Sequence, residues 1–262
     1  KHYDVDIRDE VEVENLFEKY TTDIKLIIHA AAQPSHDWAA QDPFKDFTVN
    51  ANGTLVLLEM TRRYAKDAVF IFTSTNKVYG DLEQFSYNET TTRYECIDKP
   101  NGFNEAVNLD FHSPYGTSKG SADQYMLDFA RIYGLKTAVF RHSSMFGGRQ
   151  FATEDQGWLG WFTQQAINTK KGTLLEPFTI SGNGKQVRDI LFASDAVDAY
   201  FQGAEKIEEI QGEVFNIGGG KNNSISLLEF FSLLEEHTGV NLQFDCLPWR
   251  SNDQKFYISH CA

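Results

Sequence analysis

A tyrosine and a lysine stand four residues apart in a stretch that has the signals of a helix start. Tyr115 and Lys119 follow Ser113 and Pro114, which suit the first positions because serine caps a free backbone N–H and proline needs none. Residues at this spacing lie on one helical face. A lysine ammonium beside a phenol lowers the pKa of the phenol, and such a tyrosine can exchange a proton with an alcohol or a ketone.

A hydroxyl residue ends the strand that we expect before this helix. The β-branched and aromatic run from Val69 to Thr73 predicts a buried strand, which leads to Thr75 and then to a turn at Gly80. Open α/β sheets bind ligands at the carboxyl ends of their strands. We therefore expect Thr75 to join Tyr115 and Lys119 as a third catalytic residue.

The remaining pattern predicts the elements that position these residues. Apolar residues recur at helical spacing through 122–133, and Gly134 is placed to end that helix. Alternating strands and helices indicate an α/β fold built on a doubly wound parallel sheet. We expect strands at 24–33, 136–141 and 214–218, and helices at 11–20, 42–64, 193–208 and 226–239, the last opened by a capping box at Ser226. Gly182, Asn183 and Gly184 predict a hairpin turn.

Composition excludes several classes of partner. The 262 residues carry a net charge of −13, which repels phosphate backbones, so we expect no nucleic acid. No apolar run approaches the ~20 residues of a membrane span. Cys96, Cys246 and Cys261 form no paired framework, so we expect a cytoplasmic protein without disulfides or a metal.

Four motifs together resemble the extended short-chain dehydrogenase/reductase family, the NAD-dependent epimerases and dehydratases of nucleotide sugars. They are the segments 74–81 (STNKVYGD), 112–116 (HSPYG), 141–150 (RHSSMFGGRQ) and 181–189 (SGNGKQVRD). The resemblance is greatest to members that invert C2 of a CDP-linked 3,6-dideoxyhexose. It implies an isomerase in which Thr75, Tyr115 and Lys119 act with NAD through a transient 2-keto sugar.

The resemblance also implies which residues contact NAD. Asp6 would bond the adenine, and Asn50 would support the strand that carries Thr75, with Gly53 allowing close packing there. His29 is instead expected to be a buried core histidine. The expected cofactor contacts are Asp6, Ile7, Ala30, Ala31, Ala32, Asn50, Thr73, Tyr115, Lys119, His142 and Ser143.

A second set of residues is implied for the substrate. Arg188 and Arg250 would grip the diphosphate, because the guanidinium fork matches phosphate oxygens. Asp189 would orient Arg188, and Asp253 would hold the ribose. The expected substrate contacts are Gln33, Ser35, Thr75, Asn76, Asn104, Ser144, Arg149, Arg188, Arg250 and Asp253.

The domain organisation follows from the same comparison. We expect residues 1–150 to form a Rossmann-like NAD-binding domain and 151–262 to form mainly a smaller substrate-binding α/β lobe, with 186–217 partly returning to the first domain. The family's Gly-x-x-Gly-x-x-Gly turn does not occur in these residues. We therefore expect the first β-α-β unit to be missing and dinucleotide binding to be poor.

A homodimer or homotetramer is expected through the helices at 42–64 and 115–133. Their apolar residues occupy more than one face, which permits pairing across a two-fold axis. The residues on which this expectation rests are Leu57, Leu58, Met60, Tyr125, Met126 and Phe129.

Three other functions stay open. A C4-epimerase would use the same three catalytic residues with another sugar orientation. A 4,6-dehydratase needs an acidic residue after the active-site hydroxyl, whereas Asn76 and Lys77 follow Thr75 here. A non-enzymatic binding protein is disfavoured by the intact Thr75, Tyr115 and Lys119 set.

Overall fold

The computed structural model describes residues 1–174, 176–250 and 253–260, and the chain divides into two compact units. Unit 1 comprises 1–78, 109–142 and 195–215, and unit 2 comprises 79–108, 143–194 and 216–262. This division differs from the expected boundary at residue 150, because the chain changes unit just after the strands that end at 75 and 142. The segment 79–108 therefore belongs with the second unit, and the returning segment is 195–215.

Unit 1 is built on a parallel sheet whose strands follow the order β1-β2-β5-β9. The strands β1, β2 and β5 pair in parallel, with Leu26 opposite Val69 and Val69 opposite Lys136. The strands are β1 (Leu26–His29), β2 (Val69–Thr75), β5 (Lys136–His142) and β9 (Glu213–Ile217). The helices are α1 (Glu10–Tyr20), α2 (His36–Gln41), α3 (Pro43–Phe47), α4 (Gly53–Tyr64), α5 (Ser113–Tyr133), α7 (Ala193–Glu205) and α8 (Ile207–Ile210), so the helix expected at 193–208 is divided in two.

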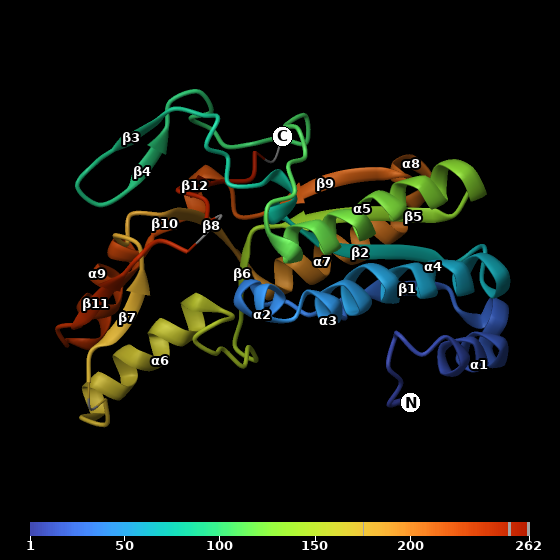
Figure 1. Cartoon of the computed structure of the whole chain (residues 1–262), viewed down its shortest axis with the longest axis horizontal. Coiled ribbons are helices and arrows are strands. Elements are labelled where there is room, and N and C mark those ends of the chain that lie inside the picture. Colours follow the sequence, from blue (N-terminus) through green and yellow to red (C-terminus); the bar gives the residue numbers. More distant parts are fainter. Residues whose placement is uncertain (175, 251–252, 261–262) are drawn as a thin grey trace. The chain divides into compact units, whose positions relative to one another are not determined.

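Both faces of this sheet are covered, since neighbouring residues of a strand point to opposite faces. Val139 of β5 belongs to the core under α4 and α5, where it packs with Phe72 and Met126. Phe140 stacks instead on Tyr200 of α7. Figure 1 shows α4 and α5 in front of the sheet and α7 behind it. The doubly wound parallel sheet is thereby confirmed.

The helix expected at 42–64 is interrupted. α3 ends at Phe47, a π-helical turn covers 48–52, and α4 begins at Gly53. A π turn inserts one extra residue into a helical turn, and such turns occur often at functional sites. Asn50 and Asn52, which are poor helix formers, lie within it.

Unit 2 holds its own apolar core. Phe162, Phe178 and Phe231 pack edge to face or tilted around it, with ring centroids 5.0 to 5.6 Å apart. The helices are α6 (Trp158–Lys171) and α9 (Leu227–Thr238), the latter opened by the expected Ser226 capping box. The strands are β3 (Tyr87–Glu89), β4 (Tyr94–Cys96), β6 (Ser144–Phe146), β7 (Phe178–Ser181), β8 (Val187–Phe192), β10 (Ser224–Ser226), β11 (Phe244–Leu247) and β12 (Phe256–Tyr257).

The hairpin expected at 182–184 is wrong. The chain turns there, with positive φ at Gly182 and Gly184, but β7 pairs with β11 while β8 pairs with β6, β10 and β12. A side chain on Gly182 would lie 2.8 Å from the ring of Trp249. The two glycines therefore allow a close turn that sends the chain from one small sheet into another.

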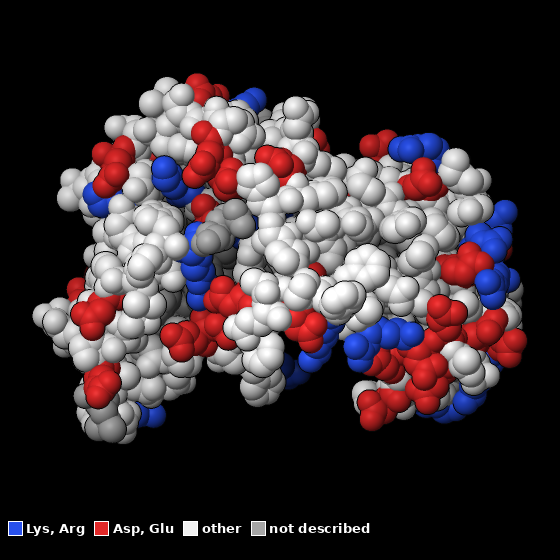
Figure 2. Space-filling model, viewed as in Figure 1, with Lys and Arg blue, Asp and Glu red and all other residues white. Residues whose placement is uncertain are grey.

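The surface of unit 1 is unevenly charged. Figure 2 shows acidic side chains gathered over α1, where Asp9, Glu10 and Glu12 are exposed, and a largely uncharged surface over α5. No helix in the described ranges has the length and apolar character needed to cross a membrane. Cys96 and Cys246 are free thiols, and Cys261 lies outside the described residues.

Candidate active site

The three expected catalytic residues lie together in unit 1. Tyr115 and Lys119 occupy the first turns of α5, and Thr75 is the last residue of β2. The Thr75 hydroxyl interacts with the phenol of Tyr115. Lys119 Nζ donates to the backbone oxygen of Thr73 at 2.6 Å and lies 4.1 Å from the centre of the Phe72 ring. β2 therefore supplies both the Thr75 hydroxyl and the backbone oxygen that holds the Lys119 amine.

Ser113 fixes the start of this helix as its sequence position predicts. Its side-chain oxygen accepts from the backbone N–H of Gly116 at 3.1 Å, and its φ is +74°. Positive φ is uncommon for serine and is concentrated at functional sites. The expected closing residue, Gly134, has φ of +68° and donates to Ala130.

The expected lowering of the Tyr115 pKa by Lys119 is not found. Burial raises the pKa of Tyr115 to about 12, against the opposing interaction with Thr75. Burial also lowers the pKa of Lys119 to about 7, so that the amine is only partly charged at neutral pH. Desolvation disfavours the charged form of each group and is the largest influence on both pKa values.

Asn50 has a different role from the one expected. Its side-chain oxygen accepts from Gln33 N at 2.9 Å, and its amide nitrogen contacts Asp46 at 3.0 Å and Ser118 of α5 at 3.1 Å. It therefore ties the segment after β1 to α5 and does not support β2. Because these contacts occupy its donors and acceptor, a direct contact with NAD is no longer expected.

A buried ion pair holds the strand tips against α5. Arg141 at the end of β5 donates to both oxygens of Asp123 of α5, at 2.8 and 2.9 Å, and Ser74 donates to the same carboxylate at 2.7 Å. The two charged side chains are 3% and 0% exposed. This pair was missed from the sequence, although an arginine within an apolar strand signals a buried partner.

The two histidines of the sheet are core residues. His29 contacts the Thr54 hydroxyl at 2.9 Å, and burial lowers its pKa to about 3, as expected for a core histidine. His142 was expected to line the cofactor. Its ring instead contacts Ser74 O at 3.3 Å and the Tyr200 hydroxyl at 2.9 Å, and burial lowers its pKa to about 4. Both ring nitrogens are used within the protein.

Other expected cofactor residues retain groups that suit NAD. Ala30 and Ala31 follow β1 and are exposed, so a ligand can approach the backbone there. The Thr73 hydroxyl donates to His29 O at 3.1 Å, beside Lys119. These residues, with the Tyr115 hydroxyl and Lys119 amine, fit the ribose and nicotinamide end of a dinucleotide.

Asp6 and Ile7 lie in the loop before α1. Asp6 is exposed and is bound by the Arg8 guanidinium, which lowers the pKa of Asp6 to about 2. Ile7 lies against Gly53, where an added Cβ would be 2.7 Å from Ile7 Cδ1. Gly53 therefore leaves space for the Ile7 side chain. It was expected instead to allow close packing against the strand that carries Thr75.

The expected sugar contacts of unit 1 are engaged in local structure. Gln33 donates through its amide to Ser35 O at 2.9 Å and to Asp46 at 3.1 Å. Ser35 is buried and caps α2 by accepting from Trp38 N. Asn76 is buried and accepts from the Thr75 hydroxyl at 3.4 Å. Ala32, which was expected to contact the cofactor, is half-buried.

In unit 2, Arg188 is paired with Asp253. Arg188 Nη2 lies 2.8 Å from Asp253 Oδ1, and the two side chains are 12% and 20% exposed. Asp189 does not orient this arginine, since its side chain points to the opposite side of β8 and accepts from the backbone N–H groups of Gly220 and Ser259, both at 3.1 Å. Asp253 was expected on the ribose and instead fixes the guanidinium.

The other expected residues of unit 2 are spread over its loops. The Ser143 hydroxyl donates to Asp189 O at 3.0 Å, and Ser144 accepts from Trp158 Nε1 at 3.0 Å. Asn104, Arg149 and Arg250 are exposed. Ser143 and Ser144 are therefore parts of the framework of unit 2, whereas the other three residues lie at its surface.

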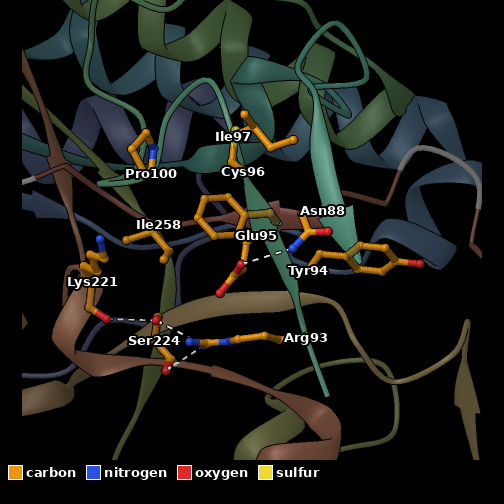
Figure 3. Close-up of a pocket in the computed structure, with 11 residues that line it drawn as sticks. Asn88, Arg93, Tyr94, Glu95, Cys96, Ile97, Pro100, Lys221, Ser224 and Ile258 are labelled. Atoms are coloured by element: carbon orange, nitrogen blue, oxygen red, sulfur yellow. Dashed lines mark hydrogen bonds between the residues drawn. The ribbon is translucent and has the colours of Figure 1, made fainter. Parts of the chain in front are cut away.

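Unit 2 also contains a cavity of about 510 Å³ beside the β3–β4 hairpin, shown in Figure 3. Arg93 at this cavity donates to Ser224 and pairs with Glu229 at 3.2 Å, and Lys221 donates to Asn101 at 3.2 Å. None of the expected site residues lines it. Its cations are thus occupied by neighbouring protein groups.

Comparison with known proteins gives the family. Residues 1–218 match the profile of the NAD dependent epimerase/dehydratase family. The chain belongs to this family. It is 55% identical over 254 residues to the CDP-paratose 2-epimerase of Salmonella typhi, a match that covers 97% of this chain and 74% of that protein.

Solved structures of the family have the same fold. A Thermotoga maritima UDP-glucose 4-epimerase, solved with UDP-glucose, superposes with a TM-score of 0.80 at 32% identity and covers 98% of this chain and 74% of that one. The Thermus thermophilus UDP-glucose 4-epimerase, solved with NAD, has a TM-score of 0.77 at 26% identity, with 97% and 74% covered. The expected NAD-dependent epimerase and its Rossmann-like fold are confirmed.

Proposed function

We propose that this epimerase inverts C2 of a CDP-linked 3,6-dideoxyhexose, converting CDP-paratose to CDP-tyvelose. The observation that carries the proposal is 55% identity, over nearly the whole chain, to a CDP-paratose 2-epimerase. The clustering of Thr75, Tyr115 and Lys119 within one unit supports it. NAD, when bound, supplies the acceptor of the C2 hydride and a positive ring.

The residues of the chain then handle the proton and the orientation. Tyr115 takes the proton of the C2 hydroxyl and returns it after the keto sugar has turned over. Thr75 holds the same oxygen. Lys119 would bind the nicotinamide ribose, and the positive charge that NAD supplies would oppose the effect of burial on the Tyr115 pKa.

In unit 2, we propose that Arg188, fixed by Asp253, holds the diphosphate while the hexose rotates. A guanidinium whose direction is already set loses little freedom on binding phosphate. Arg250, Arg149 and Asn104 at the surface supply further polar contacts.

A UDP-hexose 4-epimerase is the second candidate. The 32% identity to the Thermotoga maritima enzyme, whose structure contains UDP-glucose, favours it. The same proton transfer at Tyr115 would serve, with a different hydroxyl presented.

The assembly and location are also proposals. Leu58, Met60, Met126 and Phe129 are core residues, so they are not available for the expected dimer contact. The exposed Tyr125, Ile132 and Tyr133 of α5 keep a homodimer through this helix the best proposal, alone or within a homotetramer. The free thiols Cys96 and Cys246 suit a reducing cytoplasm.

The test is turnover of two substrates, with added NAD, by a purified protein that carries these residues together with the family's glycine-rich turn. NMR of the sugar protons is expected to show CDP-paratose becoming CDP-tyvelose, and UDP-glucose unchanged. Tyr115→Phe is expected to lower kcat by about 10²- to 10⁴-fold, because it removes the proton-transfer group, while leaving the melting temperature within a few degrees. C4 inversion of UDP-glucose with CDP-paratose untouched would establish the second candidate instead.

A further inference from the structure

Asp46 is a buried carboxyl that the reaction described above does not use. It lies on α3, is 1% exposed, and its Oδ1 accepts from Gln33 Nε2 at 3.1 Å and from Asn50 Nδ2 at 3.0 Å. Its Oδ2 is also buried and has no hydrogen-bond partner within the described ranges. Leaving a carboxylate oxygen buried and unpaired is unfavourable, so another interaction must offset that cost.

The hydrogen bonds of Asp46 lead to the catalytic helix. The Asn50 amide that donates to Asp46 also lies 3.1 Å from the Ser118 hydroxyl, and this hydroxyl donates to Tyr115 O at 3.2 Å. Ser118 is the residue between Tyr115 and Lys119 that faces the π turn. One carboxyl is thereby connected to the helical turn that holds both catalytic groups.

The charge of Asp46 acts on the same two groups. Asp46 favours the protonated forms of both Tyr115 and Lys119, and Lys119 in turn favours the ionised form of Asp46. Burial raises the pKa of Asp46 above its usual range. Helix α3 packs against α2, the π turn and α5. The titratable groups of these elements include Lys45 of α3 itself, His36 and Asp37 of α2, and Tyr115, Lys119 and Asp123 of α5.

We propose that Asp46 is a positioning residue of this active site: its buried carboxylate fixes the α5 turn through Asn50 and Ser118, and its charge favours the protonated form of Lys119. The proposal rests on the function proposed above. The Asp46 carboxylate then compensates part of the desolvation that Lys119 suffers, and it sets the pH range in which Tyr115 can accept a proton.

The decisive variant is Asp46→Asn, which keeps the shape and removes the charge. The rising limb of kcat/KM against pH, measured with CDP-paratose and NAD, is expected to move to lower pH by about half to one unit, because the charge that favours protonated Tyr115 is gone. An unmoved limb in the folded variant would overturn the proposal. Asp46→Ser, smaller and also neutral, gives the same expected shift if the asparagine variant does not fold.

Ser118→Ala is the companion variant. It removes a hydrogen bond of the network and an interaction that lowers the pKa of Asp46, but it leaves the carboxyl in place. It is expected to lower kcat several-fold and to move the limb by less than Asp46→Asn does. A purely structural role for Asp46 predicts that Asp46→Asn lowers kcat without moving the limb.

A second measurement needs no substrate. NMR of protein labelled at the lysine ε-carbons, with the Lys119 signal assigned from Lys119→Met, gives the titration midpoint of Lys119 directly. Asp46→Asn is expected to lower this midpoint, and an unchanged midpoint contradicts the proposal. If the midpoint falls but CDP-paratose is not turned over, the influence of Asp46 on Lys119 stands and the proposed substrate is wrong.

Discussion

At the scale of single residues, burial governs the pKa values of the proposed catalytic pair. Tyr115 and Lys119 are brought together as their spacing predicts, yet each is shifted toward its neutral form in the folded chain. A pKa that differs between folded and unfolded chain makes stability depend on pH. The lysine therefore provides a test that is independent of catalysis.

The Lys119 pKa of about 7 lies below its ordinary value of 10.5. Between pH 7 and pH 10.5 Lys119 holds more proton in the unfolded chain than in the folded chain, so the free energy of unfolding rises with pH over this range. The wild-type protein is expected to gain about 2 kcal/mol between pH 7 and pH 9 relative to Lys119→Met, which cannot titrate. Tyr115 titrates above this range and does not contribute. Urea unfolding at the two pH values measures the difference, and parallel stability curves would contradict the assignment.

Arg188 gives a second residue-scale prediction. Arg188→Lys keeps the charge but loses the fork that contacts Asp253 and that we propose to bind phosphate. KM for the nucleotide sugar is expected to rise about 10-fold, equivalent to about 1.4 kcal/mol, with kcat changed little. Arg93→Lys is the control, because Arg93 lies in the same unit but outside the proposed site. An equal rise in KM for both variants would argue against a diphosphate clamp.

At the scale of elements, the π turn between α3 and α4 determines which polar side chains of unit 1 contact one another. It places Asn50 toward Gln33, Asp46 and Ser118, and α4 begins directly after it at Gly53. The Gly53 backbone lies against Ile7, so the loop expected to hold adenine depends on the start of α4.

This dependence can be measured with a double-variant cycle. Gly53→Ala would gain about 1 kcal/mol in helix propensity, but its Cβ would lie 2.7 Å from Ile7 Cδ1, so a net loss of about 1 kcal/mol is expected. In an Ile7→Ala background the clash is absent, and the same substitution should become stabilising. Thermal unfolding of the four proteins gives the coupling. A Gly53→Ala effect of the same sign in both backgrounds would show that Ile7 does not account for the cost.

At the scale of the whole molecule, the local part of the structure was predictable from sequence. The helix that carries Tyr115, the strand that ends in Thr75 and the Ser226 capping box follow from spacing and residue type within a few positions. The partners of Asn50, Arg188 and Asp189 did not follow, since they join segments far apart in the chain. The same holds for the pKa of Tyr115, which depends on how fully the fold removes water from it.

The domain boundary illustrates the same limit. The boundary at residue 150 was expected from the family resemblance, but the chain changes unit just after β2 and β5, and residues 79–108 join the second unit. A sequence pattern identifies strands better than it identifies which body each connecting loop packs into. Residues 79–108 contribute the β3–β4 hairpin of unit 2.

The most direct test of C2 inversion by transient oxidation is turnover of CDP-paratose in D₂O, followed by NMR at C2 of the product. If Tyr115 removes only the hydroxyl proton and the C2 hydrogen leaves and returns as hydride, CDP-tyvelose will retain its protium at C2. Deuterium at C2 of CDP-tyvelose would show that the carbon itself exchanges a proton with solvent, and would contradict the proposed roles of Thr75, Tyr115 and Lys119.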